Sequence, residues 1–205
     1  MRRLVLPALL LLGSQVCGQA CSPAWAQNDV PPAEQIFAPT PPGFKLTDSK
    51  IDDKQRVFEF LPEGQTAKSW TERIGIVVFF GMKGRNPKDL ASALQNEWRA
   101  SCPAFSSNAP EQRLEKNYPT SITTMACSYP EPPPGRMHRE FVMAKIVQGA
   151  DSLYLVQRAW RGGPEYAPLP LTDKSTGDAW AKFFSQVEVC DTRLRGQPCA
   201  ALGKP

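Results

Sequence analysis

Runs of apolar and β-branched residues, separated by turns rich in proline and glycine, predict five strands and two helices in this chain. The predicted strands are 56–61, 74–80, 121–129, 139–147 and 153–160, and the predicted helices are 87–101 and 172–187. Segment 74–80 is continuously apolar, which is typical of a central strand covered on both faces. Between the last two strands, residues 149–152 form a connection of a length found in hairpins.

Both predicted helices carry apolar residues at helical spacing. The first is preceded by Asn86, a favourable N-cap residue, and begins with Pro87, while Asp89 faces the positive end of the helix dipole. The apolar stripe is Leu90, Leu94 and Trp98 in the first helix, and Trp180, Phe183, Phe184 and Val187 in the second. We therefore expect one face of each helix to pack on the sheet.

The element order is strand, strand, helix, three strands, helix. This order predicts an α+β domain in which an antiparallel sheet of about five strands packs against two main helices, held by disulfide bonds. We predict a signal peptide over 1–26, a proline-rich leader over 27–42, a single α+β domain over 43–189 and a disulfide-tethered C-terminal tail over 190–205. The leader has no apolar periodicity, so we expect an extended or disordered segment.

The first 26 residues have the layout of a secretory signal peptide. Arg2 and Arg3 precede the apolar run 4–12, and Ala24-Trp25-Ala26 is a small-x-small cleavage site. The apolar run is about half the roughly 20 residues that span a bilayer. We therefore expect export by the Sec route to a bacterial periplasm or to the medium, with no transmembrane segment after cleavage.

The net charge of the chain gives no support for a polyanionic partner. The formal net charge of +4 includes two signal-peptide arginines, so the exported part is close to balanced. Nothing in this balance favours a nucleic acid or an anionic membrane as partner. Proline contributes 21 of 205 residues, roughly twice its average share of about 5%, and stiffens the leader and several loops.

Four cysteines remain after signal cleavage: Cys102, Cys127, Cys190 and Cys199. They permit three pairings, of which the local one, 102–127 with 190–199, is favoured because each pair is close along the chain. The alternative is a redox or zinc site. Both of those chemistries favour closely spaced Cys-x-x-Cys ligands, and neither pair has that spacing.

No catalytic, cofactor-binding or metal-ligating constellation is evident. His138 is the only histidine, so it would have to serve any serine or cysteine nucleophile, and no Gly-x-Ser-x-Gly elbow accompanies it. Paired carboxylates could still perform acid–base chemistry. The acids expected in loops or turns are Asp52, Asp53, Glu131, Asp151 and Glu165.

The best polar constellation for a ligand or partner is Arg158, Trp160 and Arg161. Arg158 and Trp160 share one face of a predicted strand, where a guanidinium near an indole could bind a carboxylate or phosphate. The alternative is an arginine that covers apolar surface with its stem. Trp70, in a predicted loop, is a further candidate contact.

The segment Pro41-Pro42-Gly43-Phe44, together with the element order over residues 41–190, resembles the Mog1/PsbP-like fold group. The resemblance implies an antiparallel sheet with packed helices. It also implies an accessory or binding role, because few members of that group are enzymes.

The sequence therefore favours a non-enzymatic exported domain that binds a protein and serves as an accessory component of a cell-envelope complex. The alternative is a periplasmic small-ligand-binding protein that uses a cleft near Arg158 and Trp160. A carboxylate-based enzyme is the third hypothesis. A pocket lined by Arg158 and aromatic residues would favour the ligand, and an exposed apolar patch rimmed by polar groups would favour the protein partner.

Overall fold

A computed structural model describes residues 33–131, 136–162 and 172–194 of the chain. Every element below belongs to one compact unit, Pro32–Pro205. The predicted signal peptide and most of the predicted C-terminal tail lie outside the described residues.

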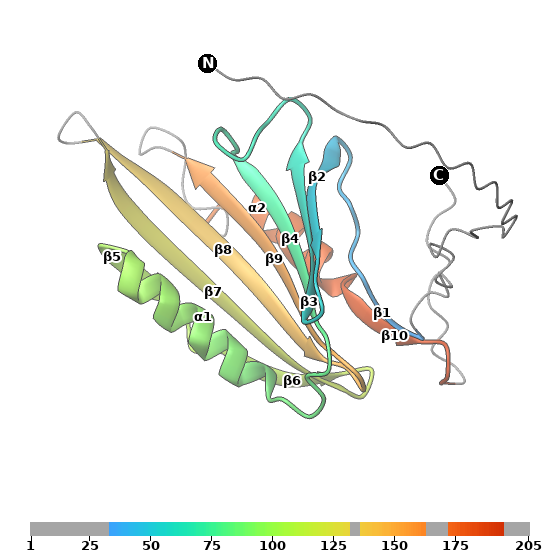
Figure 1. Cartoon of the computed structure of the whole chain (residues 1–205). Helices are drawn as coiled ribbons and strands as arrows, with labels where there is room; N and C mark the ends of the chain where they lie inside the picture. The colour runs from blue at the N-terminus through green and yellow to red at the C-terminus, as the bar shows by residue number, and fades with distance from the viewer. Residues whose placement is uncertain (1–32, 132–135, 163–171, 195–205) are drawn as a thin grey trace, which may run out of the picture. The chain divides into compact units, whose positions relative to one another are not determined.

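In the described residues four strands precede the first helix, five strands lie between the two helices, and one short strand follows the second helix (Figure 1). In chain order they are β1 (Glu34–Phe37), β2 (Phe44–Ile51), β3 (Gln55–Pro62), β4 (Glu72–Phe79), α1 (Pro87–Ser101), β5 (Ala104–Ser107), β6 (Glu111–Glu115), β7 (Tyr118–Glu131), β8 (Arg136–Gln148), β9 (Leu153–Gly162), α2 (Lys174–Ser185) and β10 (Glu188–Asp191).

The main sheet is antiparallel and has eight strands, in the order β2-β3-β4-β9-β8-β7-β5, with β6 also paired to β7. The α+β class with two helices is confirmed, but the prediction of about five strands is wrong. The five predicted strands are β3, β4, β7, β8 and β9. The strands that sequence reasoning missed, β2, β5 and β6, are largely exposed and carry mostly polar residues, so they lack the apolar signal by which strands are recognised.

A second, two-stranded sheet joins β1 to β10 in antiparallel register. The first of these strands lies inside the segment predicted as an extended or disordered leader. The second spans the boundary predicted between the domain and the tail. Each strand has four residues, which is too short for a periodic pattern to stand out.

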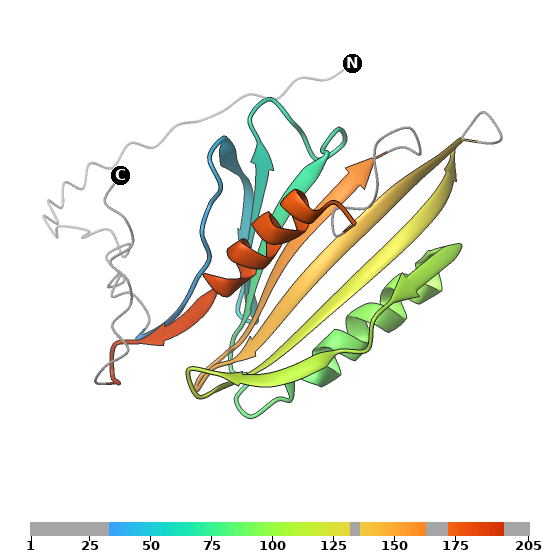
Figure 2. The ribbon, with the colours of Figure 1, turned by 180° about the vertical axis from the view of Figure 1, so that it is seen from behind.

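The two helices cover opposite faces of the main sheet (Figures 1 and 2). Successive residues of a strand point to opposite faces, so β8 contributes Ala144 and Ile146 to the core beneath α1, and Phe141 to the core beneath α2. The apolar residues predicted for the second helix are all buried there, although α2 ends at Ser185 and Val187 follows it: Trp180, Phe183, Phe184 and Val187.

Both helix starts have side-chain caps. Asn86 accepts a hydrogen bond from the Lys88 amide at 3.0 Å, which confirms the predicted cap of α1. Asp173 accepts from Ser175 and Thr176, and these hydrogen bonds lower the pKa of Asp173 to about 2. In α1 the most buried line of residues runs beside the predicted apolar stripe. Leu90, Leu94 and Trp98 pack partly buried against the core, while the fully buried line is Pro87, Ala91 and Gln95.

The predicted disulfide between Cys102 and Cys127 is confirmed, with the two Cα atoms 5.8 Å apart. It joins the C-terminal end of α1 to β7, and both half-cystines are buried. Cys190 is also disulfide-bonded. Cys199 lies outside the described residues, so the 190–199 pairing stays a prediction.

Replacing Cys102 and Cys127 together by alanine should lower the free energy of unfolding by about 3.5 kcal/mol, because the bond closes a loop of 25 residues in the unfolded chain. Urea unfolding of the oxidised protein and the double variant measures the difference. A loss below about 1 kcal/mol would show that this bond contributes little to stability.

Candidate functional site

The four residues that the sequence singles out as candidate contacts fall on opposite faces of the main sheet. Arg158 and Trp160 lie two residues apart on β9 and share the face covered by α2, whereas Arg161 points to the face covered by α1. Trp70 lies on the α1 face as well and belongs to the core there. The structure therefore does not bring these four side chains into one site.

Trp70 lies in the connection between β3 and β4, as predicted for a loop residue, but its side chain is buried. Two guanidinium groups stack on its ring: the Cζ atom of Arg73 lies 4.7 Å from the ring centre, and that of Arg161 lies 4.2 Å from it. Arg161 also donates to Glu140 at 2.7 Å. These contacts fix the end of the sheet by cation–π stacking and charge pairing.

Arg158 is a buried arginine held on three sides. Its Nε and Nη2 atoms donate to one oxygen of Glu72, Oε2, at 3.2 and 2.8 Å. Its guanidinium carbon lies 5.0 Å from the ring centre of Trp180 and 5.5 Å from that of Phe183. The indole that stacks on Arg158 therefore comes from α2, and is not the Trp160 expected from the strand pattern.

Arg158 forms part of the lining of a groove of about 410 Å³ between the proline segment that follows β1 and helix α2. We call it the Arg158 groove, and its lining residues are Pro39, Thr40, Pro41, Pro42, Arg158, Ala179, Lys182, Phe183 and Gln186. The two charged residues among them are both cationic. The groove combines an apolar wall with a positively charged end.

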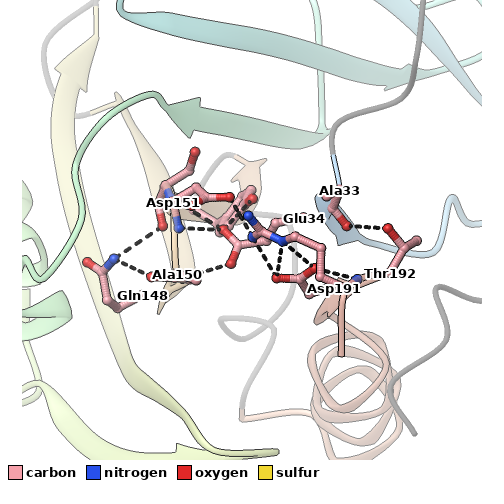
Figure 3. A network of polar contacts seen from close by, with 11 residues as sticks. Ala33, Glu34, Gln148, Ala150, Asp151, Asp191 and Thr192 are labelled. Carbon is pink, nitrogen blue, oxygen red and sulfur yellow. Dashed lines mark hydrogen bonds and ion pairs between the residues drawn. The ribbon is translucent and has the colours of Figure 1, made fainter. Parts of the chain in front are cut away.

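Glu34, at the start of β1, lies in a network of polar contacts (Figure 3) and precedes the proline wall of this groove. The buried Glu34 carboxylate accepts hydrogen bonds from the backbone amides of Ala150, Asp151 and Ser152 in the turn between β8 and β9. It also accepts from the Tyr154 hydroxyl at 3.0 Å. Four donors compensate for burying this charge, and they fix β1 and the following prolines to the main sheet.

Arg193 adds a second connection to the same turn. Its Nη2 atom lies 2.6 Å from a carboxylate oxygen of Asp151 and 2.6 Å from one of Asp191 at the end of β10. Hydrogen bonds from Arg193 lower the pKa of the buried Asp191. Burial and the nearby Glu34 carboxylate raise the pKa of Tyr154, so this hydroxyl stays a donor.

Lys145 is a buried cation that sequence reasoning missed. It lies on the α2 face of β8 and donates to two carbonyl oxygens, that of Phe184 in the last turn of α2 at 3.0 Å and that of Val187 just beyond the helix at 2.7 Å. It also pairs with Glu115. Burial lowers the pKa of Lys145. The available signal was its position between Met143 and Val147, on an apolar face where lysine is unexpected.

His138 stacks on Tyr129, with ring centres 4.7 Å apart, and its Nε2 atom is 4.0 Å from Glu140 Oε1. Burial raises the pKa of Tyr129. Of the candidate acids, Asp52 and Asp53 lie at the β2–β3 turn and Asp151 at the β8–β9 turn. Glu165 lies outside the described residues. In the described ranges no group of three or more His, Cys, Asp or Glu side chains is placed to hold a metal ion.

Large apolar side chains gather at the end of the sheet where β2, β3 and β4 meet. Ile51, Phe80 and Met82 are 59%, 41% and 37% exposed. Phe80 and Met82 border a hollow of about 510 Å³, together with Phe79 and the turn 52–55. The Phe80 amide donates to the Lys54 carbonyl at 2.8 Å, which holds the two segments together. We call Ile51, Phe80 and Met82 the terminal apolar surface.

Comparisons with known proteins identify no family. No family model matches the chain, and no curated protein sequence matches it. Among solved structures, the chain is similar to LpqN of Mycobacterium tuberculosis, described as involved in cell envelope biogenesis, with 10% sequence identity and a TM-score of 0.42 over 79% of this chain and 87% of that one. A likeness of this size establishes neither a shared fold nor a shared function. No helix in the described ranges is long and apolar enough to cross a membrane.

The Glu34 contact can be tested at Gly149. A β-carbon at this position would collide with the Glu34 carboxylate, so Gly149→Ala should displace Glu34 from its donors. We expect the free energy of unfolding to fall by about 3 kcal/mol, as for breaking a buried, hydrogen-bonded charge.

Gly75→Ala is the matched control, because a β-carbon at Gly75 has no atom within 4 Å. Chemical unfolding of both variants compares them directly. Equal stability of the two would contradict the role given to Glu34.

Proposed function

We propose that the chain is an exported, non-enzymatic domain that binds another protein of the cell envelope through the terminal apolar surface. The observation that carries the proposal is the pair of exposed side chains Phe80 and Met82 on one hollow at the end of the sheet, with the exposed Ile51 directly before the turn 52–55 that borders the same hollow. Single exposed apolar residues are ordinary on protein surfaces, whereas a group of them rimmed by polar residues marks interaction sites.

The composition of the rim supports a protein partner. The hollow is bordered by Asp52, Asp53 and Lys54 beside the apolar side chains, which matches the usual arrangement of an apolar interface core inside a polar rim. Burying one large apolar side chain contributes roughly 1.5–3 kcal/mol. Phe80 and Met82 are already more than half buried, so a partner that covers these three side chains gains only part of that value for each of them.

The location rests on the signal-peptide layout of the first 26 residues. The resemblance of element order to the Mog1/PsbP-like fold group also favours an accessory role, and membership of that group remains a prediction.

The test is capture of the partner from the native envelope by the exported protein and its variants, with mass spectrometry. A protein captured by the parent should be lost with the double variant Phe80→Ser/Met82→Ser, at least tenfold by label-free quantification. Leu46→Ser is the control, because Leu46 is 52% exposed on β2, outside the terminal apolar surface.

Circular dichroism verifies that all variants are folded. Capture that is unaffected by the double variant, or equally reduced by Leu46→Ser, would overturn the proposal, as would the absence of any partner under gentle conditions.

A second candidate function, small-ligand binding, is favoured by the Arg158 groove. Its volume of about 410 Å³ falls within the range of small-molecule sites, and it contains Arg158, which the sequence pattern singled out for this role. This function is independent of the terminal apolar surface, because the two sites share no residue.

A further inference from the structure

We propose that the Arg158 groove takes a small organic carboxylate with an apolar, preferably aromatic, body. The inference rests on the second candidate function and specifies its ligand class. Three features of the groove carry it: the unused hydrogen-bond donors of Arg158, a second cation on α2, and a stiff apolar wall.

Arg158 has donors left after it pairs with Glu72. The hydrogen bonds of its side chain run from Nε and Nη2 to a single oxygen of Glu72, so the two Nη1 donors make no hydrogen bond to the described residues. A guanidinium presents five donors in a fixed fork. Trp180 and Phe183 pack against it, which fixes its orientation, and its burial strengthens any charge-assisted hydrogen bond it donates.

Lys182 supplies the second positive charge. It lies on the exposed side of α2 and forms part of the groove lining, and its ammonium group has no ion pair among the described residues. Arg158 and Lys182 are the two charged residues of the lining, while Glu72 pairs with Arg158 and Asp178 pairs with Lys174. A cationic ligand is therefore disfavoured, whereas one negative charge is compensated from two sides.

The apolar wall determines the rest of the ligand. Pro39, Pro41 and Pro42 face Ala179 and Phe183 across the groove. Proline rings have a fixed φ angle, so the wall loses little conformational entropy when a ligand packs on it. A bare inorganic anion would leave this wall uncovered, and a neutral apolar molecule would leave the cations unused. An apolar carboxylate satisfies both.

The experiment uses three probes with the same body: 4-phenylbutyrate, 4-phenylbutanol and 4-phenylbutylammonium. Binding to the 15N-labelled exported protein is followed by NMR, through the backbone amide shifts of Ala179, Lys182 and Gln186. For about 12 non-hydrogen atoms we expect a millimolar Kd for the acid, at least tenfold weaker binding of the alcohol, and no binding of the amine.

Lys182→Gln should weaken acid binding about threefold or more, whereas Lys88→Gln, an exposed lysine on α1 outside the groove, should not change it. Arg158→Met should abolish the preference for the acid over the alcohol. Its matched control is Arg161→Met, which likewise removes an arginine that pairs with a glutamate and stacks on an indole, but on the opposite face of the sheet.

The possible outcomes distinguish the proposed ligand class from the more general proposal that the groove binds a small ligand. Equal binding of acid and alcohol at these amides would overturn the ligand class while keeping the groove as a ligand site. Shifts in none of the three amides with any probe would overturn both. An acid preference that survives Arg158→Met and Lys182→Gln would also overturn the inference.

Discussion

The packing of α2 against the main sheet is the constraint on which the rest of the structure depends. Trp180, Phe183 and Phe184 are buried against Phe141 and Val156, and each contributes roughly 1.5–3 kcal/mol of burial free energy. Because β10 begins three residues after α2 ends, this packing also places β10, and hence its partner β1. The proline wall follows from β1, so the groove exists only when α2 is docked.

Two buried charges keep this arrangement unique. An unpaired charge in a core costs several kcal/mol, so Lys145 and Glu34 are tolerated only where all their partners are in place. Lys145 needs the end of α2 and Glu115, while Glu34 needs the β8–β9 turn and Tyr154. Apolar burial supplies the larger share of the stability. The charges penalise any other placement of α2 or β1, which is a contribution to specificity.

The elements that sequence reasoning predicted correctly are those whose burial repeats along the chain. The apolar run of β4, the alternation of β8 and β9, the cap at Asn86 and the stripe of α2 each follow from local periodicity. The missed strands β1, β2, β5, β6 and β10 are short or exposed, so their pairing is decided by tertiary contacts. The local disulfide could be predicted because Cys102 follows the end of the first helix and Cys127 lies in the strand expected to return beside that helix.

In the candidate sites, too, local patterns could be predicted and tertiary contacts could not. Alternation along β9 correctly places Arg158 on one face and Arg161 on the other. The partners of Arg158 could not be predicted, because Glu72 and Trp180 are distant in sequence. The terminal apolar surface was missed because Phe80 reads as the end of a buried strand, and only the geometry of the turn at Gly81, with φ of 65°, exposes it.

The central claim is that a protein partner contacts the terminal apolar surface. Site-specific photo-crosslinking in the native envelope tests it most directly, with a photoreactive phenylalanine analogue placed at position 80 and, as a control, at position 46. The account predicts a discrete protein adduct from position 80 and none from position 46. No adduct from position 80, or the same adduct from both positions, would contradict it.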